Sequence, residues 1–386
     1  MTRRFAPQTI GLAIAAVVCM SAPAPRAQQQ HAPAAAAAKK NPLLRLAEPW
    51  PEEAVLHARR AEAEQRPLFQ KTEPLAFTLA ADFKTVNKDR NPESTARYPA
   101  VLTVTDDRGR AQTIHVRISP RGHFRRMARN CSFVPLRVEL PPAETAGTIF
   151  EGQTTLKLGT HCQDDKAYEQ ITLREYLTYP MFNLVTPKSF RARLARGSYV
   201  EAKSGKTLTT RYAIFIEHEN DVARRMGGRI VELPRTEFKD MHPATLTSMM
   251  LFEYMIGNTD FSLWALHNIR LVQDPNRTLF PVPYDFDLSG AVHAPYAIPE
   301  RRLGIRSVVD RLYRGPCRTI EEMEEAAAAF RGRRSEMLAL VDGMKDLDSA
   351  ARSEMKGYLD SFFRTIERPA SVKRQFVDGC RPSPTM

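Results

Sequence analysis

The first half of the chain has short hydrophobic runs with the two-residue period of β-strands. The runs are β-branched or alternate apolar with polar positions, and turn residues separate them, which predicts antiparallel strands. The predicted strands cover residues 75–83, 98–104, 113–118, 133–140, 154–158, 190–199 and 211–216. A helix over residues 168–183 is expected among the strands, and a short one over residues 51–65 precedes them, with Pro51 near its first turn.

The second half of the chain changes to a helical pattern. Residues 243–256 end in a continuous apolar run, as in a buried helix, and Gly257 is a natural residue to end that helix. Two short strands, residues 268–272 and 279–284, follow on either side of a turn. Residues 307–376 have the pattern of helices.

This order of strands first and helices afterwards predicts the fold class. We expect an α+β protein with a strand-rich N-terminal lobe over residues 51–216 and a helical C-terminal lobe over residues 217–386. The chain has 386 residues, 43% of them hydrophobic, which is enough to bury one large core or two modest ones.

The N-terminus has the pattern of a cleaved secretory signal. Arg3 and Arg4 precede an apolar run over residues 10–20, and small residues follow. Because the run is too short to span a bilayer as a mature helix, we expect residues 1–27 to be removed and the mature chain to be secreted or periplasmic, with no transmembrane span. An uncleaved membrane anchor is the alternative. Residues 28–50, rich in Ala, Gln, Pro and Lys, are predicted to be a disordered linker.

The charge indicates anionic partners without selecting one. The formal net charge is +12, and it is +9 without the three arginines of residues 1–27. A basic surface suits nucleotide phosphates, nucleic acid or acidic lipid, and it is equally consistent with a merely solvated surface.

The cysteines predict two disulfides. Once the signal is removed, Cys131, Cys162, Cys317 and Cys380 remain. An even number of cysteines in an exported chain favours disulfides, and of the three connectivities we favour the local one, Cys131–Cys162 with Cys317–Cys380. A zinc site is the alternative, but no C-x-x-C pair and no histidine at ligand spacing accompanies these cysteines.

The most informative segment forms two short loops joined by the predicted strand pair. It reads G-N-T-D-F-S-L-W-A-L-H-N-I-R-L and then V-P-Y-D-F-D-L-S-G, with Asp260, His267 and Asn268 in the first loop and Asp285 and Asp287 in the second. Phosphoryl transfer needs a carboxylate that orients or deprotonates the attacking hydroxyl, and oxygen ligands that hold a divalent metal against the phosphates. Asp260, Asn268 and Asp285 stand in the order in which protein kinases supply these groups, and the strand pair returns the chain to the same cleft.

Each of these residues also has a purely structural reading. Asp260 suits a turn, Asn268 and Asp287 suit caps or turns, and a histidine such as His267 is more often structural than a base. The prediction of a phosphoryl-transfer site therefore depends on the whole set of these residues, in this order and in two short loops.

The N-terminal half should supply a lysine to the phosphates and a glutamate to hold it. Lys157 lies in the predicted strand T-T-L-K-L-G, pointing away from its two leucine neighbours, and Glu175 lies on the helix that follows. The alternatives are a surface lysine and a solvated glutamate. Arg121 and Gly122 lie in a basic loop that is either a cover for phosphates or a solvated loop.

The run I-G-N-T-D, then H-N, then Y-D-F-D resembles the spore coat protein H (CotH) kinase family and, more distantly, the HipA-type kinases. The segments R-G-H-F-R-R and P-L-R-V-E-L are similar to that family's strand-loop-strand entry. The resemblance covers roughly residues 75–300. It implies a protein-kinase-like fold and metal-dependent phosphoryl transfer from ATP to a protein hydroxyl.

By motif position, the resemblance makes Asp260 the catalytic residue and makes Asn268 and Asp285 ligands of Mg²⁺ or Mn²⁺. Asp287, in the same acidic loop, is a further predicted metal ligand. Lys157, Glu175 and Arg121 would bind the nucleotide. One departure is the spacing between Asp260 and Asn268, which is eight residues here and five in ordinary protein kinases.

The sequence thus predicts an exported kinase that binds ATP and phosphorylates a protein at the cell envelope, with no nucleic-acid partner expected. Three alternatives remain open. The same site would also suit an AMP transferase or a nucleotide-binding pseudokinase, the acidic loops would suit a non-catalytic envelope binding or assembly protein, and the basic charge would suit a metal-dependent phosphodiesterase. P-loop, serine-hydrolase-elbow and zincin motifs are absent from the sequence.

Overall fold

The computed structural model describes residues 1–2, 44–105 and 109–384. The chain divides into the unit Met1–Lys40 and the compact unit Asn41–Met386, and the elements described below belong to the second. Apart from residues 1–2, the predicted signal lies outside the described residues, as does the linker up to residue 43. The end of the predicted linker contains a short helix, α1 (Leu44–Ala47), and Trp50, whose ring lies 4.2 Å from the guanidinium of Arg229.

Seven strands form a closed barrel of mixed direction, in the order β1-β2-β3-β4-β5-β7-β6. The strands are β1 (Leu75–Ala81), β2 (Tyr98–Thr105), β3 (Ala111–Pro120), β4 (Leu136–Glu139), β5 (Thr155–Gly159), β6 (Ala192–Glu201) and β7 (Thr207–Ile216). All neighbours are antiparallel except β1 and β6, which pair in parallel from Leu75 opposite Ala195 to Ala81 opposite Glu201. This parallel pair joins the two edges of the sheet.

The closed barrel overturns part of the predicted fold. The chain is α+β, but the expected protein-kinase-like fold, with two lobes of that type, is wrong because the strands close edge to edge into a barrel. The strand runs were recognisable because their hydrophobic period is local, whereas the closing pair joins residues about 120 positions apart. Closure removes the exposed strand edges on which further chains would pair.

The barrel interior is filled by one face of each strand. Leu156 and Leu158 of β5 are fully buried in this core, and Lys157 between them points outward, as the alternation predicted. Gly197 of β6 leaves room for Phe77 of β1, since a Cβ at position 197 would lie 2.3 Å from the phenyl ring. The strand that closes the barrel therefore needs glycine at this position.

Helices and a small second sheet accompany the barrel. The helices of four residues or more, α1 aside, are α2 (Glu53–Glu64), α3 (Phe83–Val86), α4 (Pro142–Thr145), α5 (Lys166–Val185), α6 (Glu219–Arg225), α7 (Pro243–Ile256), α8 (Ile320–Arg331), α9 (Arg334–Gly343), α10 (Ser349–Ile366), α11 (Pro369–Val372) and the π-helix η4 (Lys373–Val377). The second sheet has the order β10-β9-β8, with β8 (Arg229–Val231), β9 (Ile269–Gln273) and β10 (Leu279–Pro283). Short 3-10 turns are η1 (Pro67–Phe69), η2 (Phe238–Asp240) and η3 (Arg301–Leu303).

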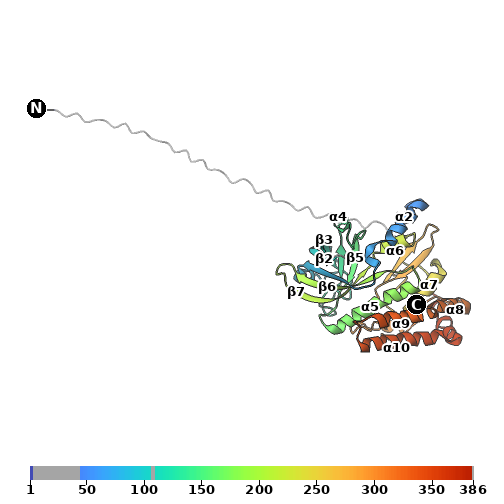
Figure 1. Cartoon of the computed structure of the whole chain (residues 1–386). Helices are drawn as coiled ribbons and strands as arrows, with labels where there is room; N and C mark the ends of the chain where they lie inside the picture. The colour runs from blue at the N-terminus through green and yellow to red at the C-terminus, as the bar shows by residue number, and fades with distance from the viewer. Residues whose placement is uncertain (3–43, 106–108, 385–386) are drawn as a thin grey trace. The chain divides into compact units, whose positions relative to one another are not determined.

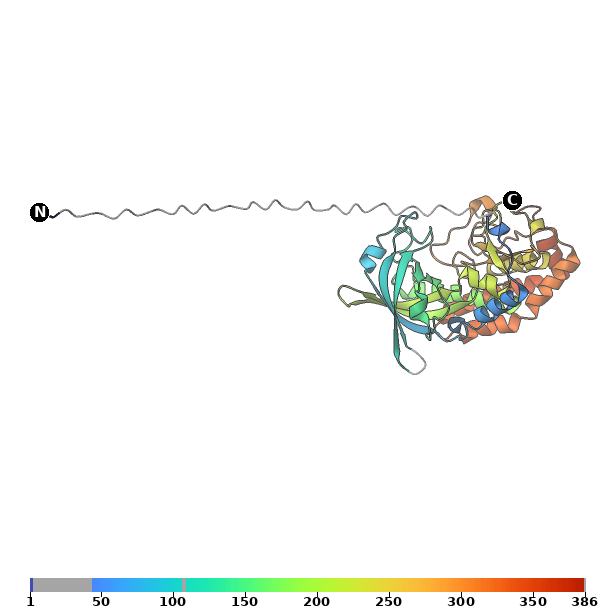
Figure 2. The ribbon, with the colours of Figure 1, turned by 90° about the horizontal axis from the view of Figure 1, so that it is seen from above.

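The barrel and the helices lie side by side in the compact unit. Figure 1 shows the barrel strands above α5, with α9 and α10 below that helix, and Figure 2 shows the barrel on one side and the late helices on the other. The predicted helix 243–256 is confirmed as α7 to the residue. The helical stretch predicted from residue 307 starts later, at Ile320, where Thr319 and Glu322 form a capping box.

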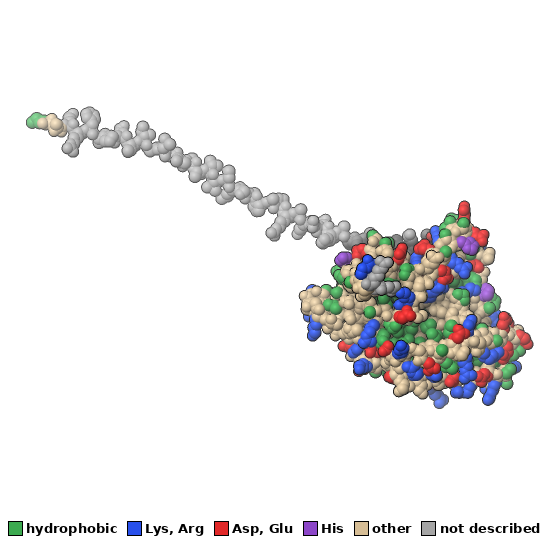
Figure 3. Space-filling view, viewed as in Figure 1, with side chains coloured by type: hydrophobic (Ala, Val, Ile, Leu, Met, Phe, Trp, Pro, Cys, Tyr) green, Lys and Arg blue, Asp and Glu red, His purple; other side chains and the backbone are tan. Residues whose placement is uncertain are grey.

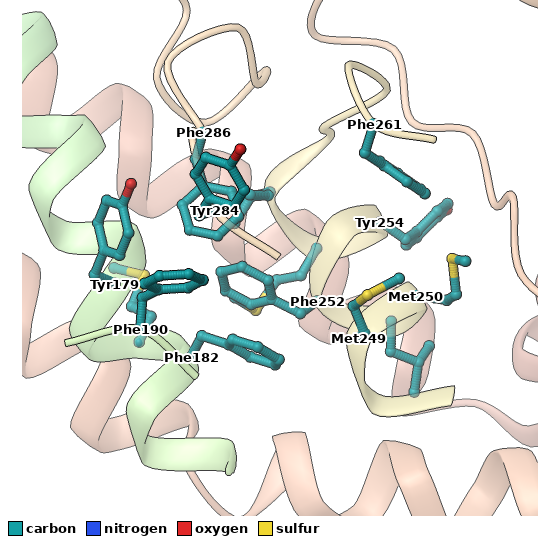
Figure 4. Packing of buried hydrophobic residues seen from close by; sticks show 14 of the residues in the cluster. Tyr179, Phe182, Phe190, Met249, Met250, Phe252, Tyr254, Phe261, Tyr284 and Phe286 are labelled. Carbon is teal, nitrogen blue, oxygen red and sulfur yellow. The ribbon is translucent and has the colours of Figure 1, made fainter. Parts of the chain in front are cut away.

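A second hydrophobic core packs α5, α7 and the late helices together. Figure 4 shows its aromatic centre, where the rings of Phe182 and Phe252 stack with centroids 4.3 Å apart. Phe286 contacts both Phe252, at 5.3 Å, and Tyr179, at 4.9 Å. The segment just after β10 is therefore anchored to α5 and α7.

Both favoured disulfides are present, Cys131–Cys162 and Cys317–Cys380. Disulfides are typical of proteins that fold in an oxidising compartment. Within residues 44–105 and 109–384, we find no helix with the length and apolar character needed to cross a bilayer.

Candidate functional site

A cavity of about 480 Å³ lies between the outer face of the barrel and the loops around β9 and β10. Six of the seven predicted site residues line it: Arg121, Lys157, Asp260, Asn268, Asp285 and Asp287. Its volume falls in the range of small-molecule and cofactor sites. The seventh predicted residue, Glu175, is buried behind this lining.

The loop after α7 brings Asp260 and Asn268 together despite their spacing. Gly257 ends the helix with φ 67°, and the side chain of Asn258 then accepts a hydrogen bond from the Asp260 N–H at 3.0 Å. Ser262 and His267 form an isolated β-bridge with backbone hydrogen bonds of 3.0 and 2.9 Å. This bridge loops out the intervening residues, so the extra spacing does not separate the two groups.

Asp260 is held by both polar neighbours. The Asn268 amide nitrogen donates to Asp260 Oδ2 at 3.0 Å and to its backbone carbonyl at 2.8 Å. His267 Nε2 lies 3.1 Å from Asp260 Oδ1, and this hydrogen bond raises the pKa of His267 above its usual value. Because the nitrogen end of Asn268 is used in this way, its amide oxygen is the end that remains to accept or to bind a cation.

The Y-D-F-D segment divides its side chains between the core and the cavity. Phe286 is buried in the core, whereas Asp285, Asp287 and the ring of the largely buried Tyr284 line the cavity. Asp285 has φ 67°, a backbone conformation that few residues other than glycine, Asn and Asp adopt. Its N–H donates to the Tyr179 hydroxyl at 3.2 Å, so α5 fixes this turn.

The carboxylate of Asp285 faces the basic loop after β3. Arg121 forms an ion pair with Asp285 Oδ2 at 3.4 Å. The barrel and the acidic loop are thereby joined across the cavity, and Arg121 lies where an anionic ligand beside Asp285 would meet it.

Lys157 has a different partner from the predicted Glu175. Its ammonium donates to Glu219 Oε2 at 2.9 Å, at the start of α6, and lies 4.0 Å from the centroid of the Tyr284 ring. Burial, with the nearby charges of Arg121 and Arg270, lowers the pKa of Lys157 to about 8, although Glu219 acts to raise it. The expected Lys157–Glu175 pair is therefore wrong. Glu219 was not expected as the partner, because α6 was not predicted.

Glu175 instead belongs to a buried cluster with Arg125 and Asp287. Arg125 Nη1 lies 4.0 Å from a carboxylate oxygen of each, and the Tyr296 hydroxyl donates to Asp287 at 3.1 Å. Burial and the repulsion between carboxylates raise the pKa of both Glu175 and Asp287. Arg125 also donates to the Thr160 carbonyl, next to the Cys131–Cys162 disulfide.

The donor set suits Mg²⁺ or Mn²⁺ bound together with a phosphate ligand. Within the described residues, no group of three or more His, Cys, Asp or Glu is placed to hold a metal by itself. Asp285, Asp287 and the amide oxygen of Asn268 are hard oxygen donors that line one cavity. Mg²⁺ is usually held by one or two carboxylates plus substrate phosphates and water, so the fit does not need a complete protein cage.

Sequence reasoning missed three cations that line the cavity: Arg125 in the loop after β3, Arg137 on β4 and Arg270 on β9. Arg137 was open to the same argument as Lys157, because it alternates with the core residues Leu136 and Val138. Arg270 was open to it as well, because it lies between the buried residues Ile269 and Leu271 in a predicted strand. On the face seen in Figure 3, basic and acidic side chains are interspersed, so that face carries no continuous basic surface.

No protein-family model matches the chain, and a search of curated proteins finds no match.

Proposed function

We propose that the chain is a metal-dependent phosphotransferase that moves the γ-phosphoryl group of ATP to a hydroxyl of a protein. The observation that carries this proposal is the composition of one cavity. Its acidic side holds Asp260, Asn268 and Asp285, and its basic side holds Lys157 and Arg121. The motif resemblance to the CotH kinases supports the same function through these residues, independently of the fold.

Asp260 is the proton acceptor in this proposal. Its hydrogen bonds with His267 and Asn268 fix the carboxylate, which is more than a third exposed and so open to an incoming hydroxyl. The hydroxyl oxygen forms a bond to the γ-phosphorus as the bond to the β–γ bridging oxygen breaks. The hydroxyl proton passes to Asp260 and then to solvent, and ADP leaves.

The basic side of the cavity neutralises the phosphates. Lys157 and Arg121 approach from the barrel, and Arg121 exchanges its contact with Asp285 for the phosphate oxygens. Asp285, Asp287 and the Asn268 amide oxygen would hold Mg²⁺ or Mn²⁺, which supplies further neutralisation of phosphate charge.

The compartment and the partner class are part of the proposal. Two disulfides favour a secreted or periplasmic protein, so the acceptor is a protein of the cell envelope. We expect no nucleic-acid partner.

The test is incubation of the full chain and Mn²⁺ or Mg²⁺ with γ-labelled or α-labelled ATP and an envelope protein extract. We expect label transfer from the γ position only, abolished in Asp260→Asn. Asp342→Asn is the matched control, since Asp342 pairs with Lys356 on exposed helices away from the cavity. Transfer of the α label would show an AMP transferase instead.

Nucleotide binding without turnover is a second candidate, favoured by the Arg121–Asp285 ion pair. That pair occupies the carboxylate that a metal would need. Saturable ATP binding with no transfer of either label would support it over catalysis.

A further inference from the structure

Five Lys and Arg side chains line the cavity; Arg125 pairs with the buried carboxylates of Glu175 and Asp287, and the other four come from three strands and a loop. Arg121 follows β3, Arg137 is on β4, Lys157 is on β5 and Arg270 is on β9. We call these four residues the cationic wall. Three aspartates line the same cavity, and among them only Asp285 forms an ion pair with a residue of the wall, Arg121.

Arg137 and Lys157 are directly opposite each other in the ladder between β4 and β5. Like charges at directly opposed positions destabilise a sheet. Glu219 compensates Lys157, but within the described ranges Arg137 forms no ion pair with any acid. A sheet that keeps this unfavourable pair on a cavity surface is better explained by an anion that binds there than by folding.

The aromatic ring in this part of the cavity is already covered by cations. The Lys157 ammonium lies 4.0 Å and the Arg270 guanidinium 4.8 Å from the centroid of Tyr284. Glu219 holds both cations, at 2.9 and 3.9 Å. The space next to β5 and α6 is therefore built from charged groups, and a nucleobase has no bare aromatic face there on which to stack.

We propose that the cationic wall binds a chain of phosphate groups, and that the phosphate donor is selected by its triphosphate and not by its base. The inference deepens the proposed function, since it states which part of the donor this site recognises. Four cations facing one cavity match the charge of a triphosphate, and guanidinium groups bind phosphate oxygens in pairs. Burial lowers the pKa of Lys157 most, and the charges of Arg121 and Arg270 lower it further; a bound phosphate chain would offset those two charges.

The experiment measures binding of ATP, GTP and inorganic tripolyphosphate to the full chain by titration calorimetry in Mg²⁺. We expect the three affinities to agree within about threefold, and tripolyphosphate to displace ATP. Arg137→Gln should weaken all three about tenfold, the loss expected for a hydrogen bond to a charged group. Arg129→Gln, an exposed arginine of the loop after β3 that does not line the cavity, should leave them unchanged.

The outcomes separate this inference from the proposed function. ATP binding more than tenfold tighter than GTP, with no displacement by tripolyphosphate, would overturn base-independent selection and leave phosphoryl transfer standing. Equal binding of all three ligands without label transfer would support phosphate binding by the cationic wall and would contradict the proposed phosphotransferase activity. Absence of binding by any of the three, in a protein with an unchanged melting curve, would overturn both.

Arg137 is exposed, so Arg137→Gln should fold. Arg270→Gln provides a second variant. Unchanged tripolyphosphate affinity in both variants would also refute phosphate binding by the cationic wall.

Discussion

Replacement of Glu219 by Gln tests the electrostatics of the cavity most informatively. Glu219 is the carboxylate that holds Lys157, and its other oxygen lies 3.9 Å from Arg270. Burial acts to raise the pKa of Glu219, but the charge and hydrogen bond of Lys157, with the charge of Arg270, lower it to about 2. In the Gln variant, Lys157 keeps its burial and its cationic neighbours and loses the group that favours its charge.

The size of the effect follows from these pKa values. Lowering the Glu219 pKa from 4.5 to about 2 corresponds to about 3 kcal/mol of stabilisation. Because the folded pKa is depressed, this stabilisation is present above pH 4.5 and is lost as the pH falls toward 2. The lowered pKa of Lys157, from 10.5 to about 8, is instead a destabilisation at pH 7, and stability rises as the pH increases from 8 to 10.5.

We therefore expect Glu219→Gln to lose about 3 kcal/mol at pH 7, in line with the removal of one partner of a buried pair. The loss should shrink at pH 10, where Lys157 is mostly neutral in the parent protein. The pKa of Lys157 should fall below 8 in the variant, so that phosphate binding becomes pH-dependent near neutrality. Urea unfolding at pH 5.5, 7 and 10 measures the stability, and calorimetry measures the binding.

Two controls make this prediction specific. The double variant Glu219→Gln with Lys157→Met should be more stable than Glu219→Gln alone, because no unpaired charge is left buried. Glu336→Gln, which breaks an exposed pair with Arg333, should change stability by less than about 0.5 kcal/mol. A Glu219→Gln variant as stable as the parent at pH 7, or one with equal losses at pH 7 and pH 10, would refute the reasoning.

Three further predictions concern the metal loop, a disulfide and a helix end. Asp285→Ala should remove the Mg²⁺ dependence of ATP affinity in calorimetry; a metal effect of parental size would contradict the ligand assignment. Replacing Cys131 and Cys162 together by Ser should cost about 4 kcal/mol in urea unfolding, from a loop closed over 31 residues, and a loss under 1 kcal/mol would contradict it. Gly257→Ala should cost at least about 1–2 kcal/mol, because φ is 67° and the new Cβ would lie 1.9 Å from the Tyr358 hydroxyl oxygen; an unchanged melting temperature would argue against this helix end.

The elements that the sequence could predict are those with a local signal. The strand runs, the helix Pro243–Ile256 and both disulfides were predicted from spacing and period alone. Asp260, Asn268 and Asp285 were predicted to lie in one cavity because two short antiparallel strands bring the loop before the first strand next to the loop after the second. In each case the constraint lies within a few tens of residues.

The features that the sequence could not predict depend on distant pairing. The parallel pairing of β1 with β6 closes the barrel, and the hydrophobic pattern within neither strand predicts this pairing. The partner of Lys157 also depends on the fold. Glu175 and Glu219 both follow Lys157 in the chain, and only the placement of α6 beside β5 brings Glu219 within 2.9 Å.

The most direct test of the cavity's function is the anomalous diffraction of crystals grown with Mn²⁺ and an ATP analogue whose β–γ bond cannot be hydrolysed. We predict one Mn²⁺ peak in contact with Asp285 and the Asn268 amide oxygen, with the phosphates against Lys157 and Arg137. A nucleotide bound elsewhere, or a Mn²⁺ peak remote from Asp285, would contradict the account.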